Sequence, residues 1–264
     1  MRSFKILTFA AGLAIAILAS SAFINSKSVA KKVHGKFAGN GFAVIELFTS
    51  EGCSSCPPAD ELVARIQKED SDKPVYILSF HVDYWNRLGW KDPFSSAGYS
   101  KRQNDYASWL KLKSVYTPQI VVNGRKEFVG SEERTLRNAI DAGLRMTPTA
   151  RLTLNAQNAP GHIILQYKAE GAGNNTTLLL ALVQKAGQTK VQNGENGGRT
   201  LLHVQIVRKV QSTPLNTSGS GSATIALPDG FTPRGYEVIG FIQNTGNGTI
   251  LAAAKSAFET GMSK

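Results

Sequence analysis

The chain of 264 residues contains two cysteines, Cys53 and Cys56, which are separated by two serines in the segment ELFTSEGCSSCPPADEL. Two thiols at this spacing can bind a metal, close a structural crosslink or form a redox centre. At the start of a helix, unpaired N–H groups and the positive end of the helix dipole stabilise a thiolate. Thiol pKa values in such motifs fall from about 8.5 to about 3.5–7.5. We therefore expect an exposed Cys53 to attack a substrate and Cys56 to resolve the mixed disulfide.

The segments on either side of the cysteine pair predict a βαβ unit. Residues 42–48, FAVIELF, are rich in β-branched and aromatic side chains and predict a strand. The segment ADELVARIQKED predicts a helix whose apolar face carries Leu62, Val63 and Ile66. The run VYILSFHV that follows is typical of a strand buried on both faces of a parallel sheet. The cysteines therefore lie between a strand and a helix.

The residues that follow, up to 148, complete an α/β domain. Residues 83–113 predict a helical insertion, which carries all three tryptophans of the chain. In the next segment, VYTPQIVVNGRKEFVG, the dipeptide Asn123-Gly124 separates two apolar runs and predicts a hairpin. Ser131 can cap a final helix.

Residues 149–258 have a different pattern and predict an all-β, sandwich-like domain. Short apolar or alternating runs are separated by Gly, Asn, Pro and Ser, as in the strands of a sandwich. The runs are RLTLNA, HIILQY, TLLLALV, LHVQIV, ATIAL, YEVIGFI and TILAAA. Domains usually contain about 100–150 residues, so the sequence predicts an α/β domain over residues 41–148 and a second domain over 149–258.

The first 22 residues predict a secretory signal peptide. Arg2 and Lys5 precede an apolar run, and small residues up to Ala22 suit a signal peptidase. The alternative is an uncleaved anchor helix, but the run is shorter than the about 20 residues that a membrane span needs. We expect cleavage, a mature chain without a transmembrane span, and a periplasmic or secreted location, where disulfides are permitted.

The chain is basic, with 30 lysines and arginines against 19 acidic residues and a net charge of +11. This excess is spread over both halves of the chain, so we expect no nucleic-acid partner. Residues 23–40 predict a flexible basic arm, and the alternative is that its lysines contact anionic lipid or nucleic acid.

Four segments in order resemble a family of secreted bacterial thioredoxin-like proteins of unassigned function. They are FTSEGCSSCPPAD, FHVDYWNRLGWKDPFS, YTPQIVVNG and GENGGRTLLH, and the resemblance covers about residues 42–257. It implies a thioredoxin-like α/β domain followed by the all-β sandwich-like domain. It also implies that Pro118 is a cis proline facing the cysteines and that the Thr117 backbone pairs with a substrate strand. The alternative is a trans proline that starts a strand.

The chain departs from most thioredoxins at the cysteine motif. Gly52 stands where most thioredoxins have an aromatic residue, and Ser54-Ser55 replaces the usual dipeptide between the cysteines. That dipeptide helps to set the redox potential, so oxidation, reduction and isomerisation of substrates all remain open. Glu51 adds a negative charge that opposes thiolate formation.

Other residues are candidates for assisting the cysteines. His81 and Asp83 end the predicted strand before the insertion, and ligands collect at the carboxyl ends of parallel strands. Asp83 could relay a proton for Cys56. The alternative is that Asp83 caps the next helix and His81 is structural. Nearby aromatics, Trp85 among them, either line a peptide groove or belong to the core.

A polar loop in the second half lies within the family resemblance. It leads into a predicted strand and carries four candidate contact residues, Glu195, Asn196, Arg199 and His203. The loop either reaches the thiol site or organises a turn of the sandwich.

The sequence predicts a periplasmic or secreted thiol–disulfide oxidoreductase. Its redox group would be the Cys53–Cys56 disulfide, with no other cofactor, and its partners would be protein thiols or disulfides and a redox partner that recharges it. One alternative is a copper(I) carrier using Cys53, Cys56 and His81, because soft thiolates suit that ion. Another is a non-catalytic binding module with a structural disulfide, although so short a loop contributes little stability.

Overall fold

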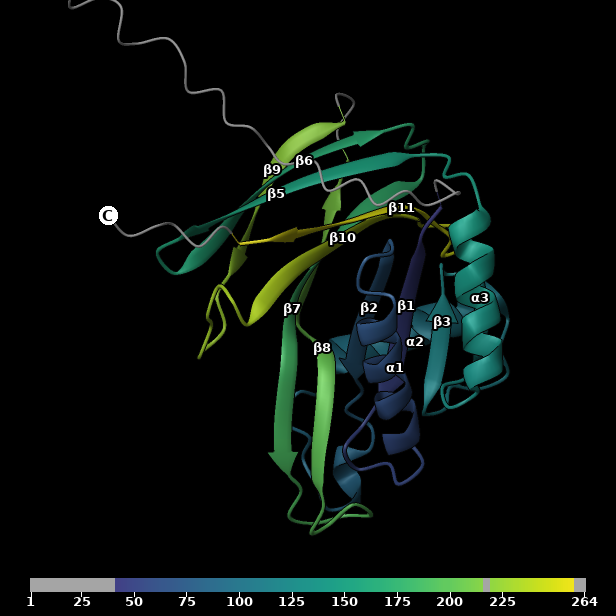
Figure 1. Ribbon diagram of the computed structural model, residues 1–264, viewed down its shortest axis with the longest axis vertical. Coiled ribbons are helices and arrows are strands. Elements are labelled where there is room, and N and C mark those ends of the chain that lie inside the picture. Colours follow the sequence, from purple (N-terminus) through teal and green to yellow (C-terminus); the bar gives the residue numbers. More distant parts are fainter. Residues whose placement is uncertain (1–40, 216–218, 259–264) are drawn as a thin grey trace, which may run out of the picture. The chain divides into compact units, whose positions relative to one another are not determined.

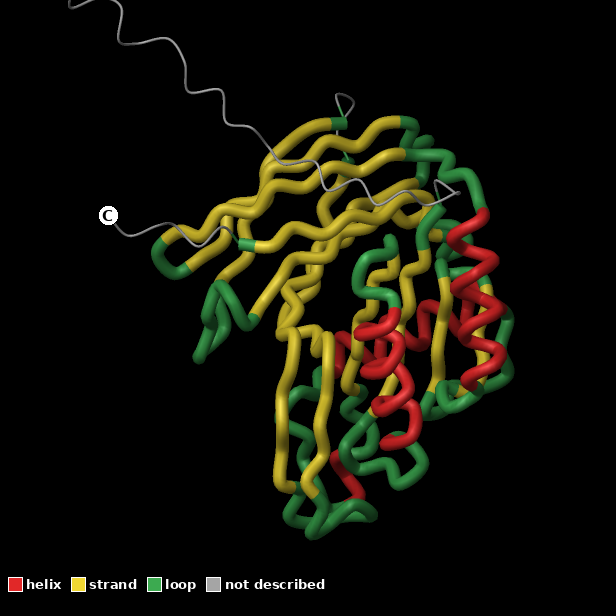
Figure 2. The backbone as a smooth tube through the Cα atoms, viewed as in Figure 1, coloured by secondary structure: helices red, strands yellow, loops and turns green. Residues whose placement is uncertain are grey.

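The computed structural model describes residues 41–215 and 219–258, and an eight-stranded mixed sheet is its largest element (Figures 1 and 2). The predicted signal peptide at residues 1–22 and the basic arm at residues 23–40 lie outside the described residues. Within those ranges, no helix combines the length and apolar character needed to cross a bilayer.

The elements alternate in the first half and are all strands in the second. The first half contains β1 (Ala43–Thr49), α1 (Pro57–Glu69), β2 (Val75–His81), the 3-10 helix η1 (Asn86–Leu88), α2 (Ala97–Leu110), β3 (Gln119–Val122), β4 (Lys126–Val129) and α3 (Glu133–Arg145). The second half contains β5 (Arg151–Ala159), β6 (His162–Glu170), β7 (Thr176–Lys190), β8 (Thr200–Pro214), β9 (Ser220–Ala226), β10 (Tyr236–Asn244) and β11 (Ile250–Ala257). The seven apolar runs predicted as strands in the second half are therefore confirmed.

Strand β1 is buried on both faces and forms the centre of the first half. Successive side chains of a strand point to opposite faces. Val44 and Phe48 accordingly pack with residues of α2, whereas Ile45 and Leu47 pack with residues of α1 and α3. One face of the sheet is thus covered by α1 and α3 and the other by α2, and β1 ends directly before the cysteine motif.

Local signals set most of the predicted boundaries. α1 begins at Pro57, and its predicted apolar face of Leu62, Val63 and Ile66 is buried. The β3–β4 turn has positive φ angles at Asn123-Gly124, as the sequence predicts. The predicted helix cap was wrong, because Glu132 rather than Ser131 is the N-cap position of α3 and makes no side-chain cap.

The eight-stranded sheet joins the two halves of the chain. Its strand order is β11-β10-β7-β8-β2-β1-β3-β4, so four strands of the second half continue the sheet of the first. At the junction β2 and β8 run parallel and pair only at Ser79 and Ile206. The Ser79 hydroxyl also donates to the carbonyl of Val204 over 2.8 Å. The second half is therefore not a self-contained sandwich.

A second sheet, β5-β6-β9, lies over the part of the large sheet that the second half provides. Leu165 of β6, Leu180 of β7 and Val238 of β10 belong to one buried apolar cluster, in which the two sheets pack together. The packing resembles a sandwich, but one of its layers also belongs to the first half.

The long hairpin of β7 and β8 reaches beyond the junction toward the cysteine loop (Figure 1). Its pairing runs to Lys190 and Thr200, so residues 191–199 form the connecting loop. That loop is the segment GENGGR of the sequence with its neighbours, and it approaches the cysteine motif.

Candidate functional site

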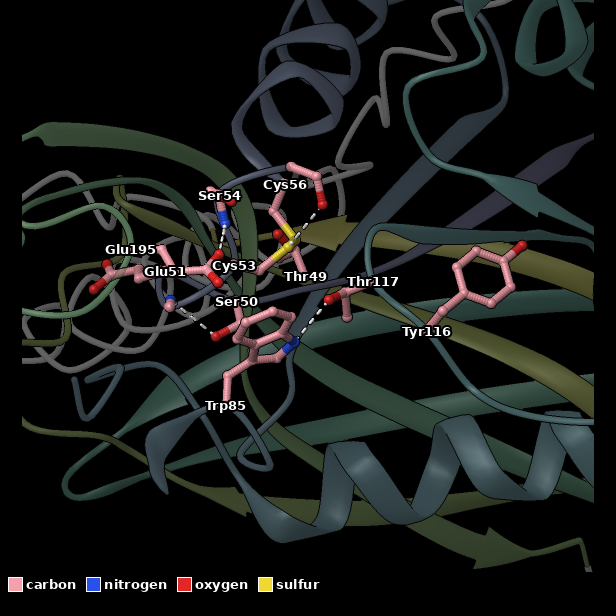
Figure 3. Close-up of a disulfide and its surroundings, with 12 residues drawn as sticks. Thr49, Ser50, Glu51, Cys53, Ser54, Cys56, Trp85, Tyr116, Thr117 and Glu195 are labelled. Atoms are coloured by element: carbon pink, nitrogen blue, oxygen red, sulfur yellow. Dashed lines mark hydrogen bonds between the residues drawn. A yellow bond between two sulfur atoms is a disulfide. The ribbon is translucent and has the colours of Figure 1, made fainter. Parts of the chain in front are cut away.

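Cys53 and Cys56 form a disulfide at the junction of β1 and α1 (Figure 3). β1 ends at Thr49, and Cys56 is the N-cap residue of α1. Two turns shape the loop, because Cys53 N–H donates to the carbonyl of Ser50 and Cys56 N–H donates to that of Cys53. Local hydrogen bonds therefore place both sulfurs at the positive end of the helix dipole.

Both cysteines are buried, with exposed fractions of 0%. The expectation of an exposed Cys53 was therefore wrong. Ser54 and Ser55, the two residues between them, are exposed. The motif thus lies at the surface through its serines while its sulfurs are covered by segments from elsewhere in the chain.

One covering side chain is Trp85, which precedes η1. Its indole N–H donates to the hydroxyl of Thr117 over 2.8 Å (Figure 3). A Cβ at Gly52 would lie 3.2 Å from the Trp85 Cβ, which is tighter than most real contacts. Trp85 therefore lies beside the residue before the first cysteine, and a side chain at position 52 would crowd its Cβ. Of the core and groove alternatives, the core alternative has support, because Trp85 is partly buried against the apolar cluster that includes Phe48 and Tyr106.

The predicted cis proline is confirmed, because the Thr117–Pro118 peptide bond is cis. Pro118 lies near the first turn of α1, since a Cβ at Gly130 would come within 3.0 Å of Ala59 and 3.1 Å of Pro118. Thr117 is linked to the cysteine loop through Trp85. Both residues expected opposite the cysteines thus lie close to their helix.

The loop of residues 191–199 lies on the cysteine motif. The Glu195 carboxylate accepts from Ser54 N–H over 2.9 Å, and the Asn196 amide donates to the carbonyls of Glu51 and Cys53, each over 2.9 Å. The Arg199 guanidinium donates to the Asn196 side chain over 2.8 Å. Of the two alternatives for this polar loop, the structure has the one that reaches the thiol site.

Next to this loop, an ionic cluster is buried between the cysteine motif, α1 and β8. His203 Nε2 lies 3.3 Å from Glu51 Oε1, and His203 Nδ1 lies 3.7 Å from Asp60 Oδ1. Trp90 donates to the other Glu51 oxygen over 2.7 Å, and Thr49 donates to the other Asp60 oxygen over 3.1 Å. The Glu51 carboxylate thus faces His203. A positive charge on this histidine would offset the negative charge of Glu51, which was predicted to oppose thiolate formation.

His203 carries a positive charge at neutral pH. Burial alone would lower its pKa, but the interactions with Asp60 and Glu51 outweigh burial and raise the pKa of His203 from 6.5 to about 10. The cluster therefore holds one imidazolium between two carboxylates.

The free energy of unfolding should fall as the pH rises from about 6.5 to about 10, by a few kcal/mol from this group. Because the folded pKa of His203 lies above the unfolded value, its contribution is complete below about pH 6.5 and is lost as the pH passes about 10. Urea unfolding across this range measures the effect. His203→Gln should have the flatter profile, and equal slopes in both proteins would contradict this assignment.

A second buried pair adjoins the cluster. His81 Nδ1 donates to Asp92 over 2.7 Å, and the His81 and His203 rings meet edge to face at 4.7 Å. Asp92 also accepts from Glu51 N–H over 2.9 Å. Burial alone would raise the pKa of Asp92, but the charge and hydrogen bond of His81 lower it. His81 therefore belongs to the site through its neighbours.

The structure does not bring Asp83 to the cysteines. Its carboxylate accepts from the Ser100 hydroxyl, and its N–H donates to the same hydroxyl over 3.0 Å. Asp83 thus bonds to Ser100 of α2 and not to Cys56. This contact resembles the helix-capping alternative. The proton relay predicted for Asp83 has no support in these contacts.

Sequence reasoning missed Asp60 and Asp92 as members of the site. Asp60 could have been found, because it lies three residues before Val63 and shares the buried face of α1. Asp92 lies in the insertion with no periodic signal around it, and only the folded loop brings it to His81. Local pattern therefore identifies one of the two.

The metal alternative gains no support. Among residues 41–215 and 219–258, no group of three or more His, Cys, Asp or Glu side chains is arranged to hold a metal ion. Cys53 and Cys56 are joined to each other, so they and His81 do not form a copper site in this state.

Comparisons with known proteins match a family and a crystal structure. A family model described as a protein of unknown function (DUF1223) matches residues 44–243. The crystal structure of protein AGR_C_4864 from Agrobacterium tumefaciens is similar, with 26% identity, a TM-score of 0.65, and coverage of 87% of this chain and 99% of that chain. A domain of the outer membrane lipoprotein Omp28 from Porphyromonas gingivalis matches at 12% identity and a TM-score of 0.26, covering 43% of this chain and 90% of that chain, which establishes no common fold. A comparison with curated proteins finds no match.

Proposed function

The chain belongs to the DUF1223 family of proteins of unknown function, and we propose that it is a thiol–disulfide oxidoreductase acting through Cys53 and Cys56. The observation that carries the proposal is the disulfide between its two cysteines at the start of α1. A crosslink spanning so short a loop contributes little stability, whereas a helix N-terminus stabilises the thiolate that exchange needs. A redox role therefore fits the position better than a structural role.

The arrangement of the first half supports a thioredoxin-like fold for residues 41–148. A strand, the cysteine pair, a helix and a parallel strand are followed by a cis proline, a hairpin and a last helix. In this proposal the substrates are protein thiols or disulfides, a separate redox partner recharges the cysteines, and the protein works in the periplasm or outside the cell, where disulfides persist.

Burial of both sulfurs means that a substrate reaches Cys53 only after its cover moves. The loop of residues 191–199 contacts the motif through three hydrogen bonds, two from Asn196 and one to Glu195. Each such bond contributes a net of about 0.5–1.5 kcal/mol, so opening the loop costs on the order of a few kcal/mol. An open form is then populated enough for exchange.

Asn196→Ala should speed reduction of the disulfide by dithiothreitol about 5- to 100-fold. The substitution removes two hydrogen bonds that hold the loop on the motif, and each 1.4 kcal/mol lost corresponds to about tenfold more open form. Stopped-flow measurement of free thiols follows the reaction. Gln192→Ala is the matched control, because this amide bonds the carbonyl of Lys190 at the end of β7 rather than the cysteine motif. Equal rates for both variants and the wild type would show that the loop does not limit access.

The experiment that tests the proposal measures the thiolate and the reduction potential. The reduced protein is titrated by the ultraviolet absorbance of the Cys53 thiolate and equilibrated with glutathione buffers. We expect a Cys53 pKa below about 8.5 and a potential between about −270 and −120 mV, the range of disulfide oxidoreductases. A pKa near the unperturbed value with a potential below about −300 mV is typical of structural disulfides and would refute the proposal in favour of a binding module.

A further inference from the structure

The ionic cluster of Glu51, Asp60 and His203 adjoins the cysteine motif and draws its buried charges from three parts of the fold. Glu51 lies in the loop before Cys53, Asp60 lies in the first turns of α1 after Cys56, and His203 is supplied by β8 of the second half. Their exposed fractions are at most 5%. Burying a charged group raises the free energy of the folded protein unless the charge is paired. The position of these charges beside the disulfide therefore suggests a functional role.

Contacts within the cluster are incomplete. Glu51 Oε1 and both ring nitrogens of His203 are buried without a hydrogen-bond partner among the residues that the structure describes, although the ion-pair distances are 3.3 and 3.7 Å. A cluster built for stability would use these atoms in short hydrogen bonds. Without such short bonds, a proton can pass between the histidine and the two carboxylates when a nearby group gains or loses charge.

The neighbour whose charge changes in the proposed reaction is Cys56. Thr49 lies beside the disulfide (Figure 3), and its hydroxyl donates to Asp60 over 3.1 Å. Asp60 N–H also donates to the carbonyl of Cys56 over 3.2 Å. A route from Cys56 to His203 would run by way of Thr49, which lies beside the disulfide, to the Asp60 carboxylate, whose Oδ1 lies 3.7 Å from His203 Nδ1. All four residues are buried.

We infer that His203, paired with Asp60 and Glu51, supplies and takes back the proton of Cys56 during exchange. This inference rests on the proposed function. It gives the second half of the chain a part in the reaction, because β8 contributes the histidine.

The inferred exchange begins with attack at Cys53 and ends with a proton on Cys56. A substrate thiolate attacks Sγ of Cys53, a bond forms between these sulfurs, and the Cys53–Cys56 bond breaks with its electron pair left on Cys56. The substrate sulfur is oxidised and Cys56 is reduced to a thiolate, which then takes a proton from His203 through Asp60 and Thr49. In the reverse direction, the Cys56 thiol returns its proton to the cluster, and its thiolate displaces the substrate thiolate from Cys53.

Burial explains why this proton matters. A thiolate at Cys56 would lie out of water, which raises its free energy unless it is protonated or faces a cation. His203 provides both possibilities, as an imidazolium and as a proton donor. The other titratable groups packed against His203 are Glu51 and Asp60 at its ring nitrogens and His81 at its ring face, and His81 is itself paired with Asp92.

The decisive test compares the pH titration of His203 by NMR in the oxidised and the reduced wild-type protein. Coupling is reciprocal, so if His203 shares its proton with Cys56, its midpoint should differ between the two states by about one pH unit. The wild-type protein is used in both states, so loss of folding cannot confuse the result. Coincident midpoints would overturn the inference.

A second measurement follows Cys56 directly. In a Cys53→Ser background, the pH midpoint for alkylation of Cys56 should rise by about one unit on adding His203→Gln, because the thiolate loses its cation. His162→Gln is the matched control, since that ring lies at the start of β6 and bonds the carbonyl of Pro160 in the β5–β6 turn. An unchanged midpoint overturns the inference while leaving the proposed function intact. Failure of the wild-type disulfide to exchange with any thiol would instead refute the proposed function.

Discussion

Cys53→Ser should reduce thiol–disulfide exchange to the rate measured without protein. Cys53 is expected to be the sulfur that a substrate attacks, and serine neither forms the disulfide nor acts as a comparable nucleophile. Cys56→Ser should keep the first attack but lose the resolving step, so a mixed disulfide with the substrate accumulates. Reduction of a disulfide-bonded protein substrate measures exchange, and mass spectrometry under non-reducing conditions detects the mixed disulfide.

Ser54 provides a matched control, whereas the Ser55 hydroxyl lies 3.4 Å from Cys53 Sγ and does not. Ser54 and Ser55 are exposed, and alanine at Ser54 keeps the backbone N–H that donates to Glu195. Ser54→Ala should therefore retain exchange within about threefold, as expected of a surface substitution. Trapping in Cys53→Ser rather than in Cys56→Ser would reverse the roles of the two sulfurs. Full activity in both cysteine variants would refute the oxidoreductase assignment.

Features carried by local pattern could be predicted from the sequence. The apolar face of α1, the turn at Asn123-Gly124 and the seven strands after residue 149 each follow from residue types within a short window. Pro118 was predicted as cis from the family resemblance. Apart from Pro118, these features share one property, which is that the residues that determine each feature lie within a short stretch of sequence.

Features that depend on distant segments could not be predicted. Pairing of β2 with β8 joins residues more than a hundred positions apart through a single residue pair, and no periodicity in either strand identifies its neighbour. The burial of Cys53 has the same cause, because segments from other parts of the chain lie against the motif, with Asn196 bonded to the carbonyl of Cys53 and Trp85 beside Gly52. Spacing predicted the nature of the cysteine motif, but its accessibility is set by the tertiary fold.

The contacts between the halves explain how the site stays assembled. Glu51 and Asp60 come from the first half and His203 from the second, so the cluster exists only while β8 stays beside β2. The pairing of β2 with β8 at one residue pair is only part of the connection, because a buried apolar cluster also joins residues of both halves, among them Phe80 of β2 and Phe241 of β10. A buried ion pair on the α2 face of the sheet adds a polar connection.

Arg102→Ala should destabilise the protein by about 3–5 kcal/mol, the usual effect of breaking a buried ion pair. Arg102 of α2 donates through Nε and Nη2 to both carboxylate oxygens of Glu46 on β1, and through Nη1 to Gln243 of β10 over 3.2 Å. Tyr106 donates to the same carboxylate. Glu46 is fully buried, so removal of Arg102 leaves its charge without a cation. Urea unfolding measures the loss.

Controls separate the ion pair from the loss of side-chain volume. Lys101, the residue before Arg102, forms an exposed ion pair with Asp105. Lys101→Ala should lower the free energy of unfolding by at most about 1 kcal/mol. Replacing both partners, as Glu46→Leu with Arg102→Met, should recover much of the stability, because no buried charge is left unpaired. Since Arg102 ties α2 and β1 to β10, Arg102→Ala should also uncouple the halves and broaden the single unfolding transition. A loss below about 1 kcal/mol with an unchanged transition would mean that the shared apolar cluster and the junction of β2 and β8 are sufficient to hold the halves together.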